Sequence, residues 1–225
     1  MTFAELKLML SQDVNRSDKE TLWYPIWINR ALRKIQSDET FSFMRNRSDV
    51  VIAQGTSSIA LPARFKQLTA EQYPVTVIDP TMGTGPLAEL PCEVTSREDM
   101  ISYRASTYVP SRPANVRGRL SGLPVWIENT AAGWTLNIID TAAEALTFRV
   151  SHFAFLADLA ADSDSNYLTT NYPELVENKI KAIAFAAIND PIAAQFEAMA
   201  ARLLSDAVLD DRRRTYRGRA LRMGG

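Results

Sequence analysis

The sequence predicts an α+β protein, in which a helical bundle built from both chain ends is interrupted by an inserted β-rich domain. Apolar residues recur every three or four positions near the amino terminus and again after Tyr167, which is the period of a helix with one buried face. Between these regions the period is two, as in a strand. We expect the helical bundle over residues 1–45 and 160–211, the β-rich domain over residues 46–159, and a basic C-terminal arm over residues 212–225.

The longest helical pattern starts at Tyr167 and predicts a hairpin of two helices. Asn171 can cap the first helix, Pro173 suits its first turn because no N–H is needed there, and Pro191 ends it. A second helix of roughly 20 residues follows, until acids and arginines take over. The apolar stripe of the first helix contains Leu175, Val176, Ile180, Ile183, Ala187 and Ile188. The stripe of the second contains Ile192, Phe196, Met199, Leu203 and Ala207.

Two more helices are predicted at the amino terminus. The first follows a Thr2 cap, and its buried face contains Phe3, Leu6, Leu10 and Val14. The second follows a capping box at residues 17–20, and one face of it contains Trp23, Trp27, Ala31, Leu32 and Ile35. Pro25 leaves two alternatives, because a proline either kinks a helix or marks its true first turn.

The middle of the chain predicts strands. Residues 50–52 and 59–61 flank Gln54-Gly55-Thr56-Ser57, which favours a hairpin. Further strands are expected at residues 73–78, 125–128, 134–139 and 146–155, with a turn at residues 131–133. Ser96 is expected to cap a short helix that runs to Tyr103, and residues 109–122 have the composition of a long exposed loop.

Composition limits the class of protein. The chain has 225 residues, of which 46% are apolar and 23% charged, as is typical of a soluble globular protein. It contains no run of about 18 apolar residues, and its first residues lack the basic region and cleavage site of a signal peptide. A single cysteine cannot form an internal disulfide, which fits a reducing compartment. We expect a protein of the cytoplasm, or of a structure assembled there, without a membrane partner.

Charge is distributed unevenly along the chain. The net charge is −1, but six arginines and no acid follow Asp211, so residues 1–211 carry −7. A short arginine run is typical of a solvated tail or an interaction arm. Ordering a backbone costs about 1–2 kcal/mol per residue, which this polar segment cannot recover by packing on itself. We therefore expect it to be ordered by a partner, and the acidic body favours a protein over nucleic acid.

No residue pattern predicts catalysis, a metal site or a cofactor. His152 is the only histidine, and its period-two neighbours indicate a strand residue with a structural hydrogen bond. Cys92 has no second cysteine or basic neighbour nearby, which favours an inert, buried thiol. One histidine and one cysteine do not suffice for the usual zinc sites. The run Met82-Gly83-Thr84-Gly85 lacks the lysine of a phosphate loop, and Pro86 removes an N–H donor.

Four stretches give the chain a resemblance to the head-to-tail adaptor (connector) proteins of tailed bacteriophages. Residues 27–35, WINRALRKI, look like the early helix of that family, and residues 55–65, GTSSIALPARF, look like its strand followed by an LPxxF turn. Residues 134–152 look like its last hairpin, and residues 167–190, with YPEL at 172–175, look like its entry into the C-terminal hairpin. The chain departs from the family pattern at Asp140–Glu144, where prolines are common, and at Ser151-His152, where an aromatic pair is common.

The resemblance implies a non-enzymatic structural protein of the virion, located at the neck between head and tail after assembly in the host cytoplasm. It implies a ring, typically a dodecamer, below the portal protein and joined to a tail or nozzle protein, which serves genome ejection. DNA would pass through the lumen without sequence-specific binding. The family's C-terminal segment reaches along the portal, so the residues expected to bind the portal are Arg212, Arg213, Arg214, Tyr216, Arg217, Arg219 and Arg222.

Two other functions stay open at this point. The first is a nucleic-acid-binding module that uses the basic C-terminal arm, whose binding to duplex DNA would weaken steeply with salt. The second is a small hydrolase that uses His152, which would lose turnover when that residue is replaced by a neutral one of similar size.

Overall fold

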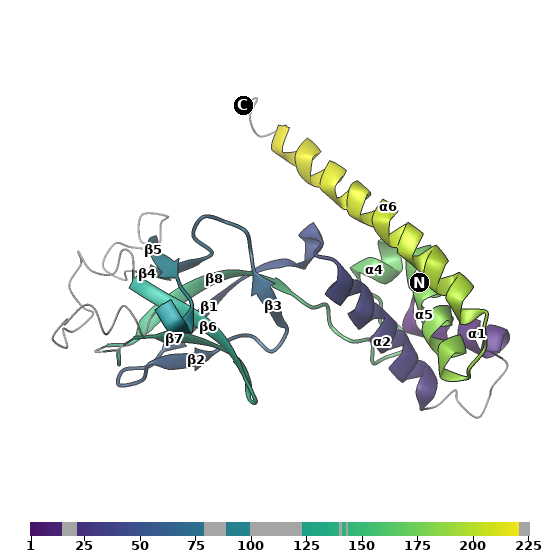
Figure 1. The fold of residues 1–225 in the computed structure, drawn as a ribbon, viewed down its shortest axis with the longest axis horizontal. Helices are drawn as coiled ribbons and strands as arrows, with labels where there is room; N and C mark the ends of the chain where they lie inside the picture. Colours follow the sequence, from purple (N-terminus) through teal and green to yellow (C-terminus); the bar gives the residue numbers. More distant parts are fainter. Residues whose placement is uncertain (15–21, 79–88, 100–122, 140, 143, 221–225) are drawn as a thin grey trace. The chain divides into compact units, whose positions relative to one another are not determined.

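The structure is a computed structural model that describes residues 1–14, 22–78, 89–99, 123–139, 141–142 and 144–220. It divides into two compact units (Figure 1). The helical unit consists of Met1–Met44 and Phe155–Gly225, and the strand unit consists of Arg45–Ala154.

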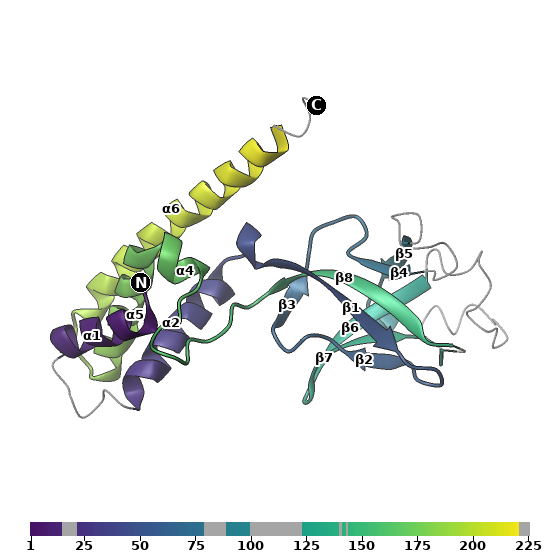
Figure 2. The ribbon, with the colours of Figure 1, turned by 180° about the vertical axis from the view of Figure 1, so that it is seen from behind.

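The helical unit is built around the pair of long helices near the C-terminus. In its described residues the elements are α1 (Phe3–Val14), α2 (Trp23–Asp38), the short 3-10 helix η2 (Ser42–Met44), α4 (Tyr167–Asn171), α5 (Pro173–Ala187) and α6 (Ala193–Ala220). α5 packs against both α2 and α6, and α1 packs against α2 and α5 (Figures 1 and 2). Segments from the two chain ends therefore form one packed unit.

Local signals explain the two N-terminal helices. The buried residues of α1 include all four of the predicted apolar positions. Thr2 and Glu5 cap it reciprocally, because the Thr2 N–H donates to Glu5 Oε2 over 2.8 Å and the Glu5 N–H donates to Thr2 Oγ1 over 3.3 Å. α2 begins at Trp23, so Pro25 lies in its first turn, which decides between the two alternatives. The predicted capping box at residues 17–20 lies outside the described residues.

The C-terminal hairpin forms, but its cap, its length and part of its apolar stripe differ from the prediction, since Met199 of that stripe is 52% exposed. Asn171 does not cap α5: it is the last residue of α4, and its side-chain amide donates to the Tyr167 carbonyl over 3.0 Å. Pro173 does occupy the first turn of α5, as predicted. α6 does not end before the arginines but continues for 28 residues to Ala220, about 42 Å at 1.5 Å per residue. Arginine is a good helix former, so the run extends the helix.

The strand unit contains eight strands in its described residues: β1 (Arg45–Ile52), β2 (Ser58–Ala60), β3 (Phe65–Leu68), β4 (Val75–Ile78), β5 (Glu89–Val94), β6 (Leu123–Thr130), β7 (Gly133–Ile138) and β8 (Leu146–Ala154). Their order is β1-β8-β4-β5-β6-β7-β2, with β3 also paired to β8. All ladders are antiparallel except that between β5 and β6. The end strands β1 and β2 lie close to each other, so the sheet is nearly closed and barrel-like.

The predicted hairpin of β1 and β2 is wrong. The turn itself forms, with Gly55 at a φ of 78° and the Thr56 N–H donating to the Ala53 carbonyl over 3.1 Å. However, Gly55 and Thr56 exchange 2.8 Å backbone hydrogen bonds with Ala142, which lies between β7 and β8. β1 consequently pairs with β8 over its whole length, and β2 pairs with β7. The two strands thus lie at opposite ends of the strand order.

The strand unit has a hydrophobic core of its own. Residues from β1 to β8 converge on it, and the fully buried ones are Ile52, Val75, Val77, Val125, Leu136, Phe148 and Val150. The predicted fold class, a helical bundle that carries an inserted β-rich domain, is therefore wrong. The protein is α+β, but its nearly closed sheet is a major core and not an accessory to a helical bundle.

Charged side chains on this sheet pair with one another. Arg149 of β8 donates to Asp49 of β1 over 2.7 and 2.8 Å and to Glu89 of β5 over 2.7 Å. Arg47 of β1 donates to the other oxygen of Glu89 over 2.8 Å. The hydrogen bond from Arg149 holds the pKa of the Asp49 carboxyl below its ordinary value. These four residues, here called the cross-strand ion pairs, connect strands that are distant in sequence.

Candidate functional site

The C-terminal half of α6 is fixed to the helical unit by a buried carboxylate. Asp211 is only 7% exposed. Its two oxygens accept hydrogen bonds from the backbone N–H and the hydroxyl of Ser42, over 2.7 and 2.6 Å. Ser42 opens η2, so Asp211 caps that short helix from another part of the chain. A buried carboxylate must be paired in this way, because its desolvation would otherwise be costly.

Further side chains around Asp211 and Ser42 hold the same part of α6. They are Tyr167, Tyr172, Asp210 and Arg214, and these six residues together are here called the anchor. Phe43 stacks on Tyr167 with ring centroids 4.1 Å apart and on Phe41 at 5.0 Å. Tyr172 lies 6.3 Å from both Phe41 and Tyr167. Its hydroxyl donates to Asp210 of α6 over 3.2 Å. Burial, reinforced by this hydrogen bond, raises the pKa of Tyr172 to about 12.

One predicted arginine takes part in the anchor. Arg214 forms an ion pair with Asp210 over 2.9 Å, at the i,i+4 spacing of a helix, and donates to the Tyr167 hydroxyl over 3.3 Å. The Thr215 hydroxyl donates to the Asp211 carbonyl over 2.9 Å. Asp210, Asp211 and Arg214 therefore connect this part of α6 to the rest of the helical unit.

The other predicted arginines differ from Arg214. Arg212 and Arg213 are exposed, and neither makes an ion pair or hydrogen bond with any residue that the structure describes. Tyr216, Arg217 and Arg219 belong to α6, although only their backbone is described, and Arg222 lies outside the described residues. Within the helical unit, the end of α6 projects past α4 and α5 (Figures 1 and 2). The basic segment thus begins as a continuation of α6, and Arg212 and Arg213 are exposed on it without a partner among the described residues.

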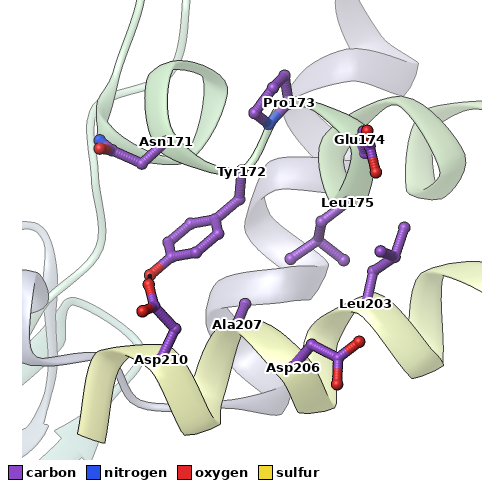
Figure 3. Close-up of a pocket in the computed structure, with 9 residues that line it drawn as sticks. All are labelled: Asn171, Tyr172, Pro173, Glu174, Leu175, Leu203, Asp206, Ala207 and Asp210. Atoms are coloured by element: carbon purple, nitrogen blue, oxygen red, sulfur yellow. Dashed lines mark hydrogen bonds between the residues drawn. The ribbon is translucent and has the colours of Figure 1, made fainter. Parts of the chain in front are cut away.

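A groove lies next to the anchor, where α4 and α5 meet α6 (Figure 3). Its volume is about 390 Å³. Leu175, Leu203 and Ala207 supply apolar surface, and the carboxylates of Glu174 and Asp206 lie beside it. Glu174 and Asp206 are exposed, and neither forms an ion pair with the described part of the chain. The groove is therefore apolar in its centre and acidic at its edge.

The sequence did not identify Asp210, Asp211 and Tyr172 as anchoring residues. Asp210 and Asp211 read as the solvated end of an amphipathic stripe, because nothing near them in sequence indicates that Ser42 lies opposite. One sequence signal could have located these residues on the helix. Good helix formers continue from Ala193 to Arg214, which favours a helix that runs through Asp210 and Asp211.

The residues considered for chemistry have structural positions. His152 is fully buried in β8, its Nδ1 lies 3.1 Å from the Val150 carbonyl oxygen, and its ring stacks on Phe65. The interpretation of His152 as a strand residue with a structural hydrogen bond is confirmed. Cys92 is buried in β5, where desolvation raises the pKa of its thiol to about 12. The run 82–85 lies outside the described residues.

The described residues contain no group of three or more histidine, cysteine, aspartate or glutamate side chains that could hold a metal ion. In the same residues, no helix combines the length and apolarity needed to cross a bilayer.

Comparison with known proteins adds the family. A family model described as SU10 adaptor protein matches residues 1–224, which is nearly the whole chain. A comparison with curated proteins gives no match. The resemblance to head-to-tail adaptors carried by the four sequence stretches is thereby confirmed. The chain belongs to the SU10 adaptor protein family, consistent with a phage head-to-tail adaptor of the virion neck that interacts with portal and tail proteins.

Proposed function

We propose that the protein forms a ring, typically of twelve copies, directly below the portal, joins the portal to the tail, and surrounds a lumen through which DNA passes. The C-terminal part of α6 docks on the portal. The observation that carries this proposal is the pair of exposed arginines, Arg212 and Arg213, just beyond a buried anchor on a helix that projects from its unit. The chain is a structural connector and catalyses no reaction.

The anchor gives the docking segment a defined direction. Asp211 holds α6 at Ser42, and Arg214 holds it at Asp210 and Tyr167. Because these contacts already fix the base of the segment, less conformational entropy is lost when residues 212–220 bind a partner. A free coil of the same length would lose about 1–2 kcal/mol per residue on ordering.

A ring makes weak contacts sufficient. An exposed ion pair contributes about 0–1 kcal/mol, so two or three arginines per copy would bind an acidic surface weakly. Copies joined in one ring bind together, and their effective concentration raises the overall affinity well above that of one segment. Arginine suits this role because its guanidinium binds carboxylates in a bidentate manner. The net charge of −7 on residues 1–211 also suits a DNA conduit, since like charge prevents DNA from sticking.

Charge reversal at the two free arginines tests the docking segment. The double variant Arg212→Glu/Arg213→Glu should fold normally, because both side chains are exposed and unpaired in the described residues, yet lose cosedimentation with heads that carry an open portal. The matched control is Arg64→Glu, which changes the charge of an exposed arginine in the strand unit and should attach like the wild type. Normal attachment of the double variant would show that residues 212–213 do not bind the portal.

The basic segment also leaves nucleic-acid binding as a second candidate function. Purified protein that binds duplex DNA with a steep loss of affinity as salt rises would support that function, because each phosphate contact releases counterions. An adaptor with an acidic body should bind duplex DNA weakly at all salt concentrations. The charge-reversal variant sharpens the result, because it should abolish DNA binding only if these arginines contact phosphates.

A further inference from the structure

The helical unit carries large apolar side chains at the start of α2 that stay partly exposed, although Trp23 also contacts Trp27 with ring centroids 6.3 Å apart. Leu22, Trp23 and Ile26 are 63%, 42% and 46% exposed, and they lie at the start of α2. Trp23 and Ile26 are three residues apart, so they share one face of the helix. These three residues, together with Arg30 one turn further on, are here called the α2 patch. Arg30 is exposed and makes no ion pair with a described residue.

The groove of Figure 3 has the opposite character at its edge. Its centre is apolar, with Leu175, Leu203 and Ala207, and its free carboxylates are Glu174 and Asp206. Asp210 is already occupied by Tyr172 and Arg214, so it closes one end of the groove. Such a groove favours an occupant that combines large apolar side chains with a cation, because either free carboxylate would repel an acidic one.

The α2 patch has the composition that the groove favours, namely large apolar side chains together with a cation. Most of the exposed large apolar side chains in the described residues are isolated along the chain. Leu22, Trp23 and Ile26 are the one group of three among them that falls within five consecutive positions. Arg30 supplies the cation on the same face of α2, four residues after Ile26. Tryptophan is also the residue type that most often dominates binding energy at the centre of an interface.

We infer that the α2 patch of one copy inserts into the groove of the next copy in a ring. Two different surfaces of one chain that complement each other form a heterologous, head-to-tail contact, which closes into a ring if the rotation allows. Burying Trp23 and Ile26 against Leu175 and Leu203 removes apolar surface from water, while Arg30 pairs with Glu174 or Asp206. This inference rests on the ring of the proposed function and adds the residues that join its copies.

Cysteine cross-linking distinguishes this contact from any symmetric one. Full-length protein with Ile26→Cys and Asp206→Cys would be assembled on its portal, oxidised mildly, and separated by non-reducing electrophoresis. Both sites are exposed, so folding should be unaffected, and the native Cys92 is buried. Each single variant has one accessible thiol per chain and should stay monomeric, because the contact joins residue 26 to residue 206 of the next copy, whereas a symmetric contact would give dimers. The double variant should give a ladder of trimers and larger species, because each copy joins two different neighbours.

The possible results separate the inference from the proposed function. A ladder with the double variant supports the contact. A ring on the portal, established by the mass of the complex, without species larger than dimers overturns the contact and leaves the ring in place. Absence of any ring on the portal overturns the proposed function, and the inference with it. As an independent check, Arg30→Glu should lose ring formation and Arg30→Glu/Asp206→Arg should regain it, whereas a structural defect at α2 would not be rescued.

Discussion

Charged side chains find their partners differently in the two units. In the strand unit, Arg149, Asp49, Glu89 and Arg47 satisfy one another across strands on a partly exposed surface. In the helical unit, Asp211 is buried and satisfied by Ser42, while Arg212 and Arg213, the next two residues, have no partner among the described residues. Within the described residues, the cross-strand ion pairs thus use one another as partners, whereas α6 is held at Asp211 and presents Arg212 and Arg213 for a partner elsewhere.

Both units leave large apolar side chains exposed. The strand unit gathers Phe148, Val150 and Leu136 into its core but leaves Tyr73 nearly half exposed. The helical unit leaves Trp23, Ile26 and Met199 at least two-fifths exposed. Surface of this kind is typical of a protein that packs against other chains, because isolated globular units bury such residues where they can.

Removing the buried anchor should give the largest change in stability. Asp211→Ala leaves the Ser42 N–H and hydroxyl without their charged acceptor, which should cost about 2–3 kcal/mol in the free energy of unfolding. Urea unfolding followed by far-ultraviolet circular dichroism measures this loss. The control Asp206→Ala removes an exposed carboxylate of the same helix and should change stability by less than about 0.5 kcal/mol. Equal losses in the two variants would contradict the anchoring role of Asp211.

Breaking the cross-strand ion pairs should give a smaller loss. Arg149→Met keeps the apolar stem of the side chain and removes the hydrogen bonds to Asp49 and Glu89, at a cost of about 1 kcal/mol or less. Because Arg149 lowers the folded-state pKa of Asp49, the stabilisation is present above the carboxyl's ordinary pKa, and it is lost as pH falls through the lowered value.

The pH dependence therefore checks the ion pairs directly. Wild-type stability should fall when pH drops below about 4, near the unfolded pKa of an aspartate. In Arg149→Met this fall should be shallower, because the hydrogen bond from Arg149 is the largest cause of the lowered pKa of Asp49. If the free energy of unfolding falls equally steeply at low pH in the variant and in the wild type, the ion pairs contribute nothing to stability.

Sequence reasoning succeeded where the determining interactions are local. α1 and α2 follow from apolar period, the Thr2 cap and Pro25 in a first turn. The turn at Gly133, with a φ of 111°, and strands β6, β7 and β8 are similarly local. The family resemblance was also visible, because it depends on the order of short stretches along the chain.

Sequence reasoning failed where distant segments decide. The alternation around Gly55 looks like a hairpin, but Ala142 takes the hydrogen bonds of that turn and separates β1 from β2. β5 was missed because Pro91 lies inside it, and a proline argues against a strand unless the missing N–H is tolerated at that position. The predicted fold class gave too much weight to the helical bundle, because a helical period is visible in a short stretch of sequence. A nearly closed sheet depends instead on pairings between strands that are distant in the chain.

The site was predicted in part. The arginine run was recognised as a candidate for binding, but it was expected to be an arm after a helix that ends earlier. The structure continues the helix to Ala220 and uses Arg214 as part of the anchor. The buried acceptor role of Asp211 could not be predicted, because it depends on Ser42, which lies 169 residues away in the chain.

Hydrogen exchange of the backbone amides at residues 212–220 tests the docking segment most directly. In the free protein, this end of α6 should exchange faster than the helix before Asp211, since the last turns of a helix fray. On binding the portal, the same amides should become strongly protected, while those of β8 in the strand unit should not change. Equal exchange of residues 212–220 in the free and portal-bound protein would contradict the account.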